Sequence, residues 1–158
     1  MELTAYHEAG HAFMATYFGA KVQCVTIEPD DDDGPERFGD TQVIWRRSRL
    51  SDREFSERAI QVSLAGPVAE MLYSGDAYHP GLVAEWANDW QAAWELAAPL
   101  FVDPRKRLEH LETVTRQLYR LMDAEPNWSA IAALADGLLA HETLEAEEVK
   151  EIVNEWLG

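Results

Sequence analysis

Apolar residues near the start of the chain recur every three or four positions, which is the spacing of one face of an α-helix. The pattern predicts a helix at residues 4–18. Two later segments, residues 23–29 and 41–45, are short and rich in β-branched and aromatic residues, so they predict two strands. We therefore expect a helix that is followed by a small antiparallel β element.

The rest of the hydrophobic pattern predicts a series of helices. Ser51 and Glu54 have the S-x-x-E spacing of a capping box, which opens a helix towards Tyr73. Gly66-Pro67 interrupts this stretch, and because proline removes a helical hydrogen bond we expect either two helices or one bent helix. After a loop at residues 74–81, we expect helices at residues 82–100, 104–122 and 128–140, and a terminal helix that Thr143 caps and that ends near Leu157.

These elements predict a mainly α (α+β) fold, with the small antiparallel β element after the first helix and a bundle of helices behind it. The chain has 158 residues, of which 47% are hydrophobic, and this is enough for one core. We expect a single domain that spans residues 1–158.

Composition narrows the classes of function. The chain has 13 basic and 29 acidic residues, so its net charge is 13 − 29 = −16, which argues against nucleic-acid binding. The one cysteine, Cys24, cannot form an internal disulfide, and no stretch has the length or apolar character of a signal peptide or a membrane span. We expect a cytoplasmic protein without a membrane span. The aspartate run Asp30–Asp33 is expected to be a solvated loop, because it lacks the alternating spacing of calcium ligands.

The clearest chemical signal is the motif H-E-x-x-H at residues 7–11, inside the first predicted helix. Residues i and i+4 lie on one helical face, so His7 and His11 can bind one zinc ion through nitrogen at roughly 2.0–2.1 Å. Glu8 stands beside that face, where a carboxylate can take a proton from a water whose pKa zinc lowers from about 15.7 towards 7. The alternative interpretation is two surface histidines on an ordinary helix.

A catalytic zinc site needs a third protein ligand and an open position for water. Glu85 and Asp89 have i, i+4 spacing, so both carboxylates should lie on one face of their predicted helix, where one could bind zinc while the other supports it. His110 and His141 lie in polar surroundings, and His79 lies in a predicted loop, as solvated histidines often do. Spacing alone leaves six candidates open: Glu70, His79, Glu85, Asp89, His110 and His141.

Five segments match, in order, the motifs of one known family. Residues 4–12 (TAYHEAGHA) are similar to its zinc-site helix, and residues 25–29 (VTIEP) to the strand after it. Residues 64–70 (LAGPVAE) are similar to its L-x-G-R-x-A-E-E helix, residues 88–89 (ND) to its S-N-D segment, and residues 142–149 (ETLEAEEV) to its E-T-L-x-x-x-E-V signature. With these segments the chain resembles the peptidase domain of the FtsH-type proteases, which are membrane-anchored AAA+ enzymes.

The resemblance implies a zinc metallopeptidase with polypeptide substrates, and it implies a homo-oligomer as one form of assembly. It also implies that Asp89, the aspartate of the S-N-D segment, is the third zinc ligand besides His7 and His11. Glu85 then becomes a solvated carboxylate or a group that supports the site. By the same resemblance, the strand around Val25 is expected to bind an extended substrate through main-chain pairing at a sheet edge.

Two features depart from the family pattern. The sequence has no G-x-x-x-x-G-K-[ST] phosphate-binding loop, so the chain is not expected to unfold substrates by itself, and a separate AAA+ ATPase is a candidate partner. Pro67 and Met71 stand where the family has an arginine and a second glutamate. These changes bear on the shape of the site and the range of substrates more than on metal binding.

Three tryptophans, Trp86, Trp90 and Trp94, recur every four residues around Asp89. Aromatic stripes at helical spacing usually face the interior, so we favour core packing over the wall of a peptide cleft or a subunit contact.

The sequence thus predicts a zinc-dependent endopeptidase that hydrolyses unfolded or short polypeptides without ATP. Zinc is expected on His7, His11 and Asp89, with Glu8 as the catalytic general base. The alternative is a proteolytically inactive zinc-binding regulatory or interaction protein derived from the same domain.

Overall fold

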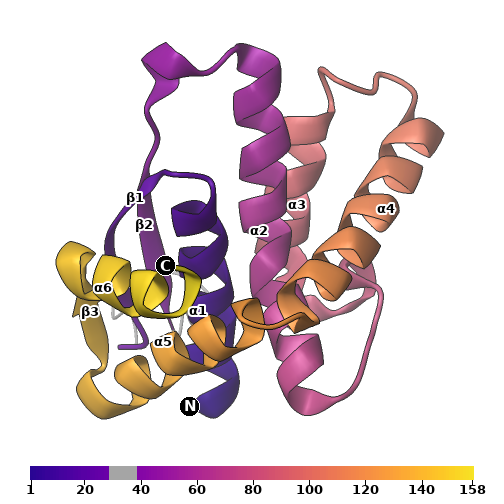
Figure 1. The fold of residues 1–158 in the computed structure, drawn as a ribbon. Helices are drawn as coiled ribbons and strands as arrows, with labels where there is room; N and C mark the ends of the chain where they lie inside the picture. Colours follow the sequence, from indigo (N-terminus) through magenta and orange to yellow (C-terminus); the bar gives the residue numbers. More distant parts are fainter. Residues whose placement is uncertain (29–38) are drawn as a thin grey trace.

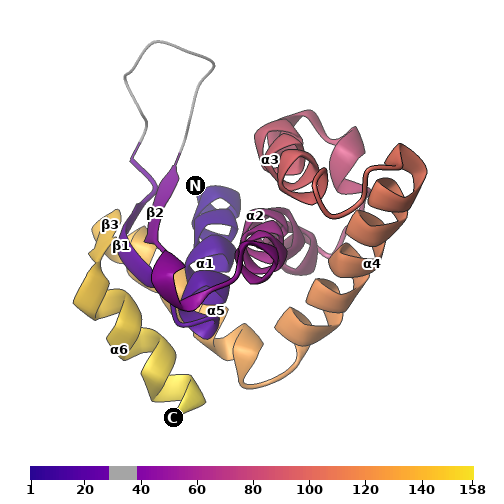
Figure 2. The same ribbon diagram turned by 90° about the horizontal axis from the view of Figure 1, so that it is seen from above.

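Two long helices, α1 (Glu2–Tyr17) and α2 (Asp52–Ser74), lie side by side at the centre of the fold (Figures 1 and 2). The computed structural model describes residues 1–28 and 39–158, so the predicted Asp30–Asp33 loop lies outside the described part. Most residues of α1 between Ala5 and Ala15 are buried, because a small sheet covers one side of the helix and other helices cover the rest. A helix that is buried on several sides positions its polar residues firmly, and α1 carries the H-E-x-x-H motif.

The predicted β element is present, and it has three strands. β1 (Lys21–Thr26), β2 (Asp40–Ile44) and β3 (Thr143–Glu145) form an antiparallel sheet in the order β2-β1-β3. A register shift between Val22 and Cys24 puts an extra residue into β1. This bulge allows Val22 and Val25, three positions apart, to be buried together.

The third strand corrects two predictions. Thr143 was expected to cap a helix, but it lies in β3, and Glu145 is the residue that caps the following helix α6 (Ala146–Leu157). β1 is the central strand and pairs on both sides, so the prediction of a sheet edge around Val25 is wrong. The edges are β2 and β3.

Helix α2 begins as predicted and is uninterrupted. The capping box is confirmed, since the Ser51 hydroxyl accepts from the Glu54 backbone N–H while the Glu54 carboxylate accepts from the Ser51 N–H. Pro67 lies inside this one helix, so the expectation of two helices is wrong and a single helix is correct. Gly75 ends α2 with a φ of 79°, which is the left-handed conformation that glycine adopts most readily.

The helix predicted at residues 82–100 is shorter than expected. Two short 3₁₀ turns, Pro80–Leu82 and Ala84–Trp86, come first, and α3 covers only Ala87–Ala97. Glu85 is therefore exposed in a turn and does not share a helix with Asp89. A third 3₁₀ turn, Arg47–Arg49, precedes α2.

The last helices agree with the prediction. They are α4 (Pro104–Asp123), α5 (Asn127–His141) and α6, and all six helices contribute to one hydrophobic cluster together with β1 and β3. The fold class, mainly α (α+β), is confirmed. In residues 1–28 and 39–158, no helix combines the length and the apolar character that crossing a bilayer requires.

Candidate metal centre

His7 and His11 lie on one face of α1, with their Nε2 atoms 3.1 Å apart. The adjacent helix α2 supplies partners for the other two ring nitrogens. His7 Nδ1 lies 2.6 Å from Glu70 Oε2, and His11 Nδ1 lies 2.6 Å from the Val62 carbonyl oxygen. Because a carbonyl or a carboxylate accepts, each Nδ1 carries a proton, and the Nε2 lone pairs of both rings point to the same place.

Asp89 completes this cluster from the first turn of α3. Its Oδ2 atom lies 2.7 Å from His7 Nε2 and 3.4 Å from His11 Nε2. A tetrahedral zinc ion with nitrogen and oxygen ligands at about 2.0–2.1 Å separates its ligand atoms by about 3.3 Å. The separations between the three side chains are thus close to those of a zinc site, and these atoms form one candidate metal-binding group.

The electrostatics of the cluster favour a bound positive charge. Burial lowers the pKa of His7, but hydrogen bonding to Asp89 and Glu70 outweighs burial and raises this pKa to about 10. Burial raises the pKa of Asp89, but the two imidazoles outweigh it and hold this pKa well below its usual range. An ion would replace the second proton of the imidazoles, and two neutral imidazoles with a carboxylate are a donor set that suits zinc.

Gly66 of α2 leaves the space that an ion would need. A Cβ atom at this position would lie 2.4 Å from His11 Nε2 and 2.7 Å from His7 Nε2, so it would collide with both imidazoles. Any side chain would therefore fill the centre of the cluster. The space at Gly66 and the donor set agree, so the residues present fit a metal ion of the size of zinc.

Glu8 lies beside the histidines and is buried, with 7% of its surface exposed. The Thr41 hydroxyl of β2 donates to Glu8 Oε1 at 2.7 Å. Gly39 packs against the same side chain, since a Cβ atom there would lie 2.9 Å from Glu8 Cγ. The start of β2 thus holds the Glu8 carboxylate in one orientation next to His7.

A tryptophan supports the carboxylate that binds His7. Trp86 is buried and its Nε1–H donates to Glu70 Oε2 at 2.5 Å, so this one oxygen accepts from both Trp86 and His7. Such partners fix the orientation of a ligating imidazole and tune its basicity.

Comparisons with known proteins identify relatives over nearly the whole chain. An "ATP-dependent zinc metalloprotease FtsH 4" of Sorangium cellulosum is 30% identical over 95% of this chain and 28% of its own length. Nearly the whole chain therefore corresponds to an FtsH-type protease domain.

Two further relatives of the FtsH type have similar coverage. An "ATP-dependent zinc metalloprotease FtsH" of Acidimicrobium ferrooxidans is 29% identical over 99% of this chain, and the rice protein "FTSH 9, chloroplastic/mitochondrial" is 27% identical over 96%. The chain spans less than a third of the length of each of these FtsH-type relatives, namely 28%, 28% and 22%. No protein-family model matches the chain.

The other histidines and carboxylates that the sequence offered as third ligands lie outside the cluster of this FtsH-type chain. His79 Nε2 lies 3.0 Å from Glu112 Oε2, and the His110 ring stacks on an aromatic ring at 4.4 Å. Glu85 and His141 are exposed. Of the six candidates, the structure brings Asp89 next to the free histidine nitrogens and Glu70 next to the protonated nitrogen of His7.

The tryptophan stripe divides into different environments. Trp86 is in the core, as the favoured interpretation predicts, whereas Trp90 and Trp94 are half-buried. The Trp90 ring contacts the His79 ring edge-on, and the Arg107 guanidinium lies 4.6 Å from the centre of the Trp94 ring.

Sequence analysis did not identify three supporting groups of this FtsH-type site: the Thr41 hydroxyl, the Val62 carbonyl and the Trp86 N–H. Each comes from an element far along the chain from α1, and none has a motif of its own.

Proposed function

We propose that this chain is a zinc-dependent endopeptidase domain that hydrolyses peptide bonds in unfolded or short polypeptides. The observation that carries the proposal is the convergence of His7, His11 and Asp89 over Gly66, with a buried carboxylate beside them. Kinship with zinc metalloproteases supports the same chemistry. We further propose that residues 1–158 act as one peptidase domain.

Each residue of the candidate metal centre has its own proposed role. His7, His11 and Asp89 bind the ion, while Glu70 and Val62 orient the two imidazoles. When bound, zinc supplies Lewis acidity that polarises a peptide carbonyl and lowers the pKa of water.

Glu8 is the proposed general base of the reaction. Its carboxylate takes a proton from the attacking water and later donates it to the leaving amine, so that the side chain returns to its starting state. Thr41 keeps Oε1 of Glu8 hydrogen-bonded through this cycle, which leaves Oε2 for the proton.

The edge strand β2 is the proposed place for an extended substrate. It lies at one side of the sheet and connects to Glu8 through Thr41. Main-chain pairing with a strand edge binds peptides with little preference for their side chains. This proposal replaces the pairing with β1, which the sheet order excludes.

The proposal also covers the partners of the protein and its location in the cell. The names of the relatives describe ATP-dependent proteases, so we propose that an AAA+ ATPase delivers folded substrates, and that the domain assembles into a homo-oligomer. A cytoplasmic location stays a prediction.

The test combines metal content with cleavage. We expect one zinc ion per chain and cleavage of unfolded casein or a fluorogenic peptide. Glu8→Gln should keep the metal and lose about 10²- to 10⁴-fold in rate, which is the usual contribution of a general base. Glu147→Gln, at an exposed glutamate of α6, is the matched control and should retain full activity.

Each other result excludes part of the proposal. Stoichiometric zinc without cleavage of any unfolded substrate would leave the alternative, a proteolytically inactive regulatory protein. Cleavage that is insensitive to Glu8→Gln would exclude Glu8 as the base. A protein that binds no metal at neutral pH would contradict both functions.

A further inference from the structure

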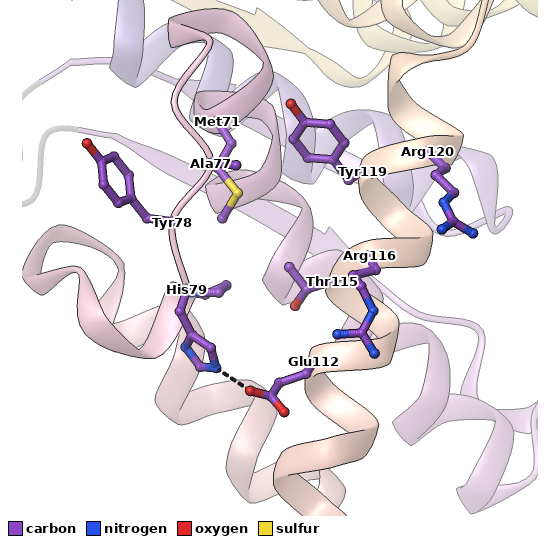
Figure 3. A pocket seen from close by; sticks show the side chains of 10 residues that line it. Met71, Ala77, Tyr78, His79, Glu112, Thr115, Arg116, Tyr119 and Arg120 are labelled. Carbon is purple, nitrogen blue, oxygen red and sulfur yellow. Dashed lines mark hydrogen bonds and ion pairs between the residues drawn. The ribbon is translucent and has the colours of Figure 1, made fainter.

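A hollow of about 350 Å³ lies between the segment at residues 77–80 and helix α4, and we call it the α4 pocket (Figure 3). Figure 3 shows that Thr115 and Tyr119 point from α4 towards this segment, while Met71 of α2 lies behind it. None of the residues in the His7, His11 and Asp89 cluster lines this pocket. Its volume is in the range of sites for small organic ligands.

One wall of the α4 pocket is tied to α4 by His79. The Nδ1 atom of His79 accepts from the Gly81 backbone N–H at 3.0 Å, so Nε2 carries the proton and donates to Glu112 Oε2, also at 3.0 Å (Figure 3). Both ring nitrogens are therefore in use, and His79 acts as a strap between the two walls. This bond holds the two walls together before a ligand binds, which lowers the entropy cost of binding.

Two arginines, Arg116 and Arg120, line the same pocket, and their guanidinium groups have hydrogen-bond donors left for a ligand. On a helix, Glu112 would be the i−4 partner of Arg116, but its carboxylate is engaged by His79. Arg116 donates only to the Thr113 hydroxyl, at 3.3 Å. Across residues 1–28 and 39–158, neither Arg116 nor Arg120 forms an ion pair with a carboxylate.

The chain is acidic overall, with 29 acidic and 13 basic residues, so two arginines that line one pocket form a locally cationic site. A guanidinium group binds a carboxylate with two parallel, charge-assisted hydrogen bonds. The neighbouring Tyr78 and Tyr119 side chains offer apolar surface to a ligand that the arginines bind, and the buried Met71 lies behind them. The lining thus combines a cationic rim with an apolar interior.

We propose that the α4 pocket binds a carboxylate that carries an apolar body. The carboxylate lies on Arg116 and Arg120, and the apolar body packs against Tyr78 and Tyr119. Two sources have this chemistry: the free C-terminus of a polypeptide with an apolar last residue, and a small apolar organic acid. The proposal does not depend on peptidase activity, since it concerns binding at a different place.

The first experiment uses probes from both sources. N-acetyl-alanyl-leucine represents the peptide C-terminus and phenylbutyrate the small acid, each compared with its neutral amide by NMR titration of the full chain. We expect saturable shifts at Tyr78, Thr115 and Tyr119, and binding of the acid at least about tenfold tighter than that of its amide. Saturation by only one of the two acids identifies the source.

The second experiment asks whether the arginines recognise the charge. Arg116→Gln combined with Arg120→Gln should weaken binding of the acid at least about tenfold. Arg105→Gln combined with Lys106→Gln removes the same charge from the first turn of α4, outside the pocket, and should change affinity less than about twofold.

Three results would overturn the proposal: no saturable binding of either acid, equal affinity for acid and amide, or equal weakening by both double variants. Glu8→Gln should bind the acids as well as the wild type does. The α4 pocket and the zinc endopeptidase can therefore fail separately.

Discussion

Gly66 is the residue whose replacement separates the metal from the fold. Gly66→Ala puts a methyl group 2.4 Å from His11 Nε2, where the ion is proposed to lie, while alanine itself favours a helix by up to about 1 kcal/mol over glycine. We expect zinc affinity to fall by more than about tenfold, with the helical circular dichroism unchanged.

The measurement for Gly66 is a zinc titration against a chromophoric chelator, run beside far-ultraviolet circular dichroism. The outcome that counts against a metal site over Gly66 is wild-type zinc affinity in a folded Gly66→Ala protein. A variant that loses both metal and helix signal would be followed by Asp89→Asn, which removes a proposed ligand and adds no volume.

Trp86 allows a test of how a group acts on the metal through two others. Trp86→Phe keeps an aromatic ring but removes the N–H that donates to Glu70, so Glu70 loses one of the two bonds that orient it towards His7. Loss of an outer partner typically costs about 10- to 100-fold in metal affinity or activity, and we expect the lower end because Trp86 acts through Glu70.

The matched control for Trp86 is the same substitution four residues on. In the part of the chain that the structure describes, the Trp90 indole N–H has no hydrogen-bond partner, so Trp90→Phe should leave zinc affinity unchanged. Equal zinc affinity in both variants would mean that the bond from Trp86 does not position the site.

At the scale of elements, the contact between α1 and α2 is closest at Gly10. A Cβ atom at Gly10 would lie 2.4 Å from the Ala65 carbonyl oxygen, which is backbone and cannot rotate away. Gly10→Ala should therefore force the helices apart and lower the free energy of unfolding by about 1–3 kcal/mol, as overpacking does. Urea unfolding measures this change.

The control for Gly10 is Gly137→Ala in α5. There the nearest atom is a Leu144 side-chain carbon at 3.3 Å, which can move, so we expect a change of less than about 1 kcal/mol. Equal free energies of unfolding for Gly10→Ala and Gly137→Ala would contradict a tight contact between α1 and α2 at Gly10.

The elements also show which part of the fold local sequence determines. The capping box at Ser51 and the H-E-x-x-H helix involve neighbours within one or two turns, and both were predicted correctly. β3 was missed because three residues pair only with a strand more than a hundred positions earlier, a contact that no local pattern encodes. At Pro67 the local sequence left two helices and one bent helix open, and burial of α2 on both sides of the proline maintains one helix.

The same distinction between local and long-range contacts applies to the candidate metal centre. His7 and His11 were found from spacing on one helix, but Asp89 required a family resemblance, since its approach depends on how α3 packs on α2. Glu85 was an equal candidate only while residues 82–100 were taken as one helix, and the 3₁₀ turns before α3 remove that equivalence.

At the scale of the whole molecule, the proposed ion would join two helices, α1 and α3, that both pack mainly on α2. The two histidines come from α1 and Asp89 from α3, and α2 lies between these helices (Figure 2). In α3 only Ala93 and Ala97 are fully buried, and Trp90, Trp94 and Leu96 pack against the core while partly exposed. A bond from zinc to its first turn would contribute a large share of its attachment.

Removal of zinc should therefore lower the local stability of some elements more than that of others. A ligand at 100 times its dissociation constant stabilises the folded state by about 2.7 kcal/mol, so a chelator should lower the melting temperature of the wild type but not of Asp89→Asn. Hydrogen–deuterium exchange should rise most in the 3₁₀ turns and α3, at residues 80–97. It should rise least in α5 and α6, which carry no proposed ligand. A uniform rise, or a rise confined to α5 and α6, would contradict a zinc bridge between α1 and α3, because a bridge protects first the element that depends on it most.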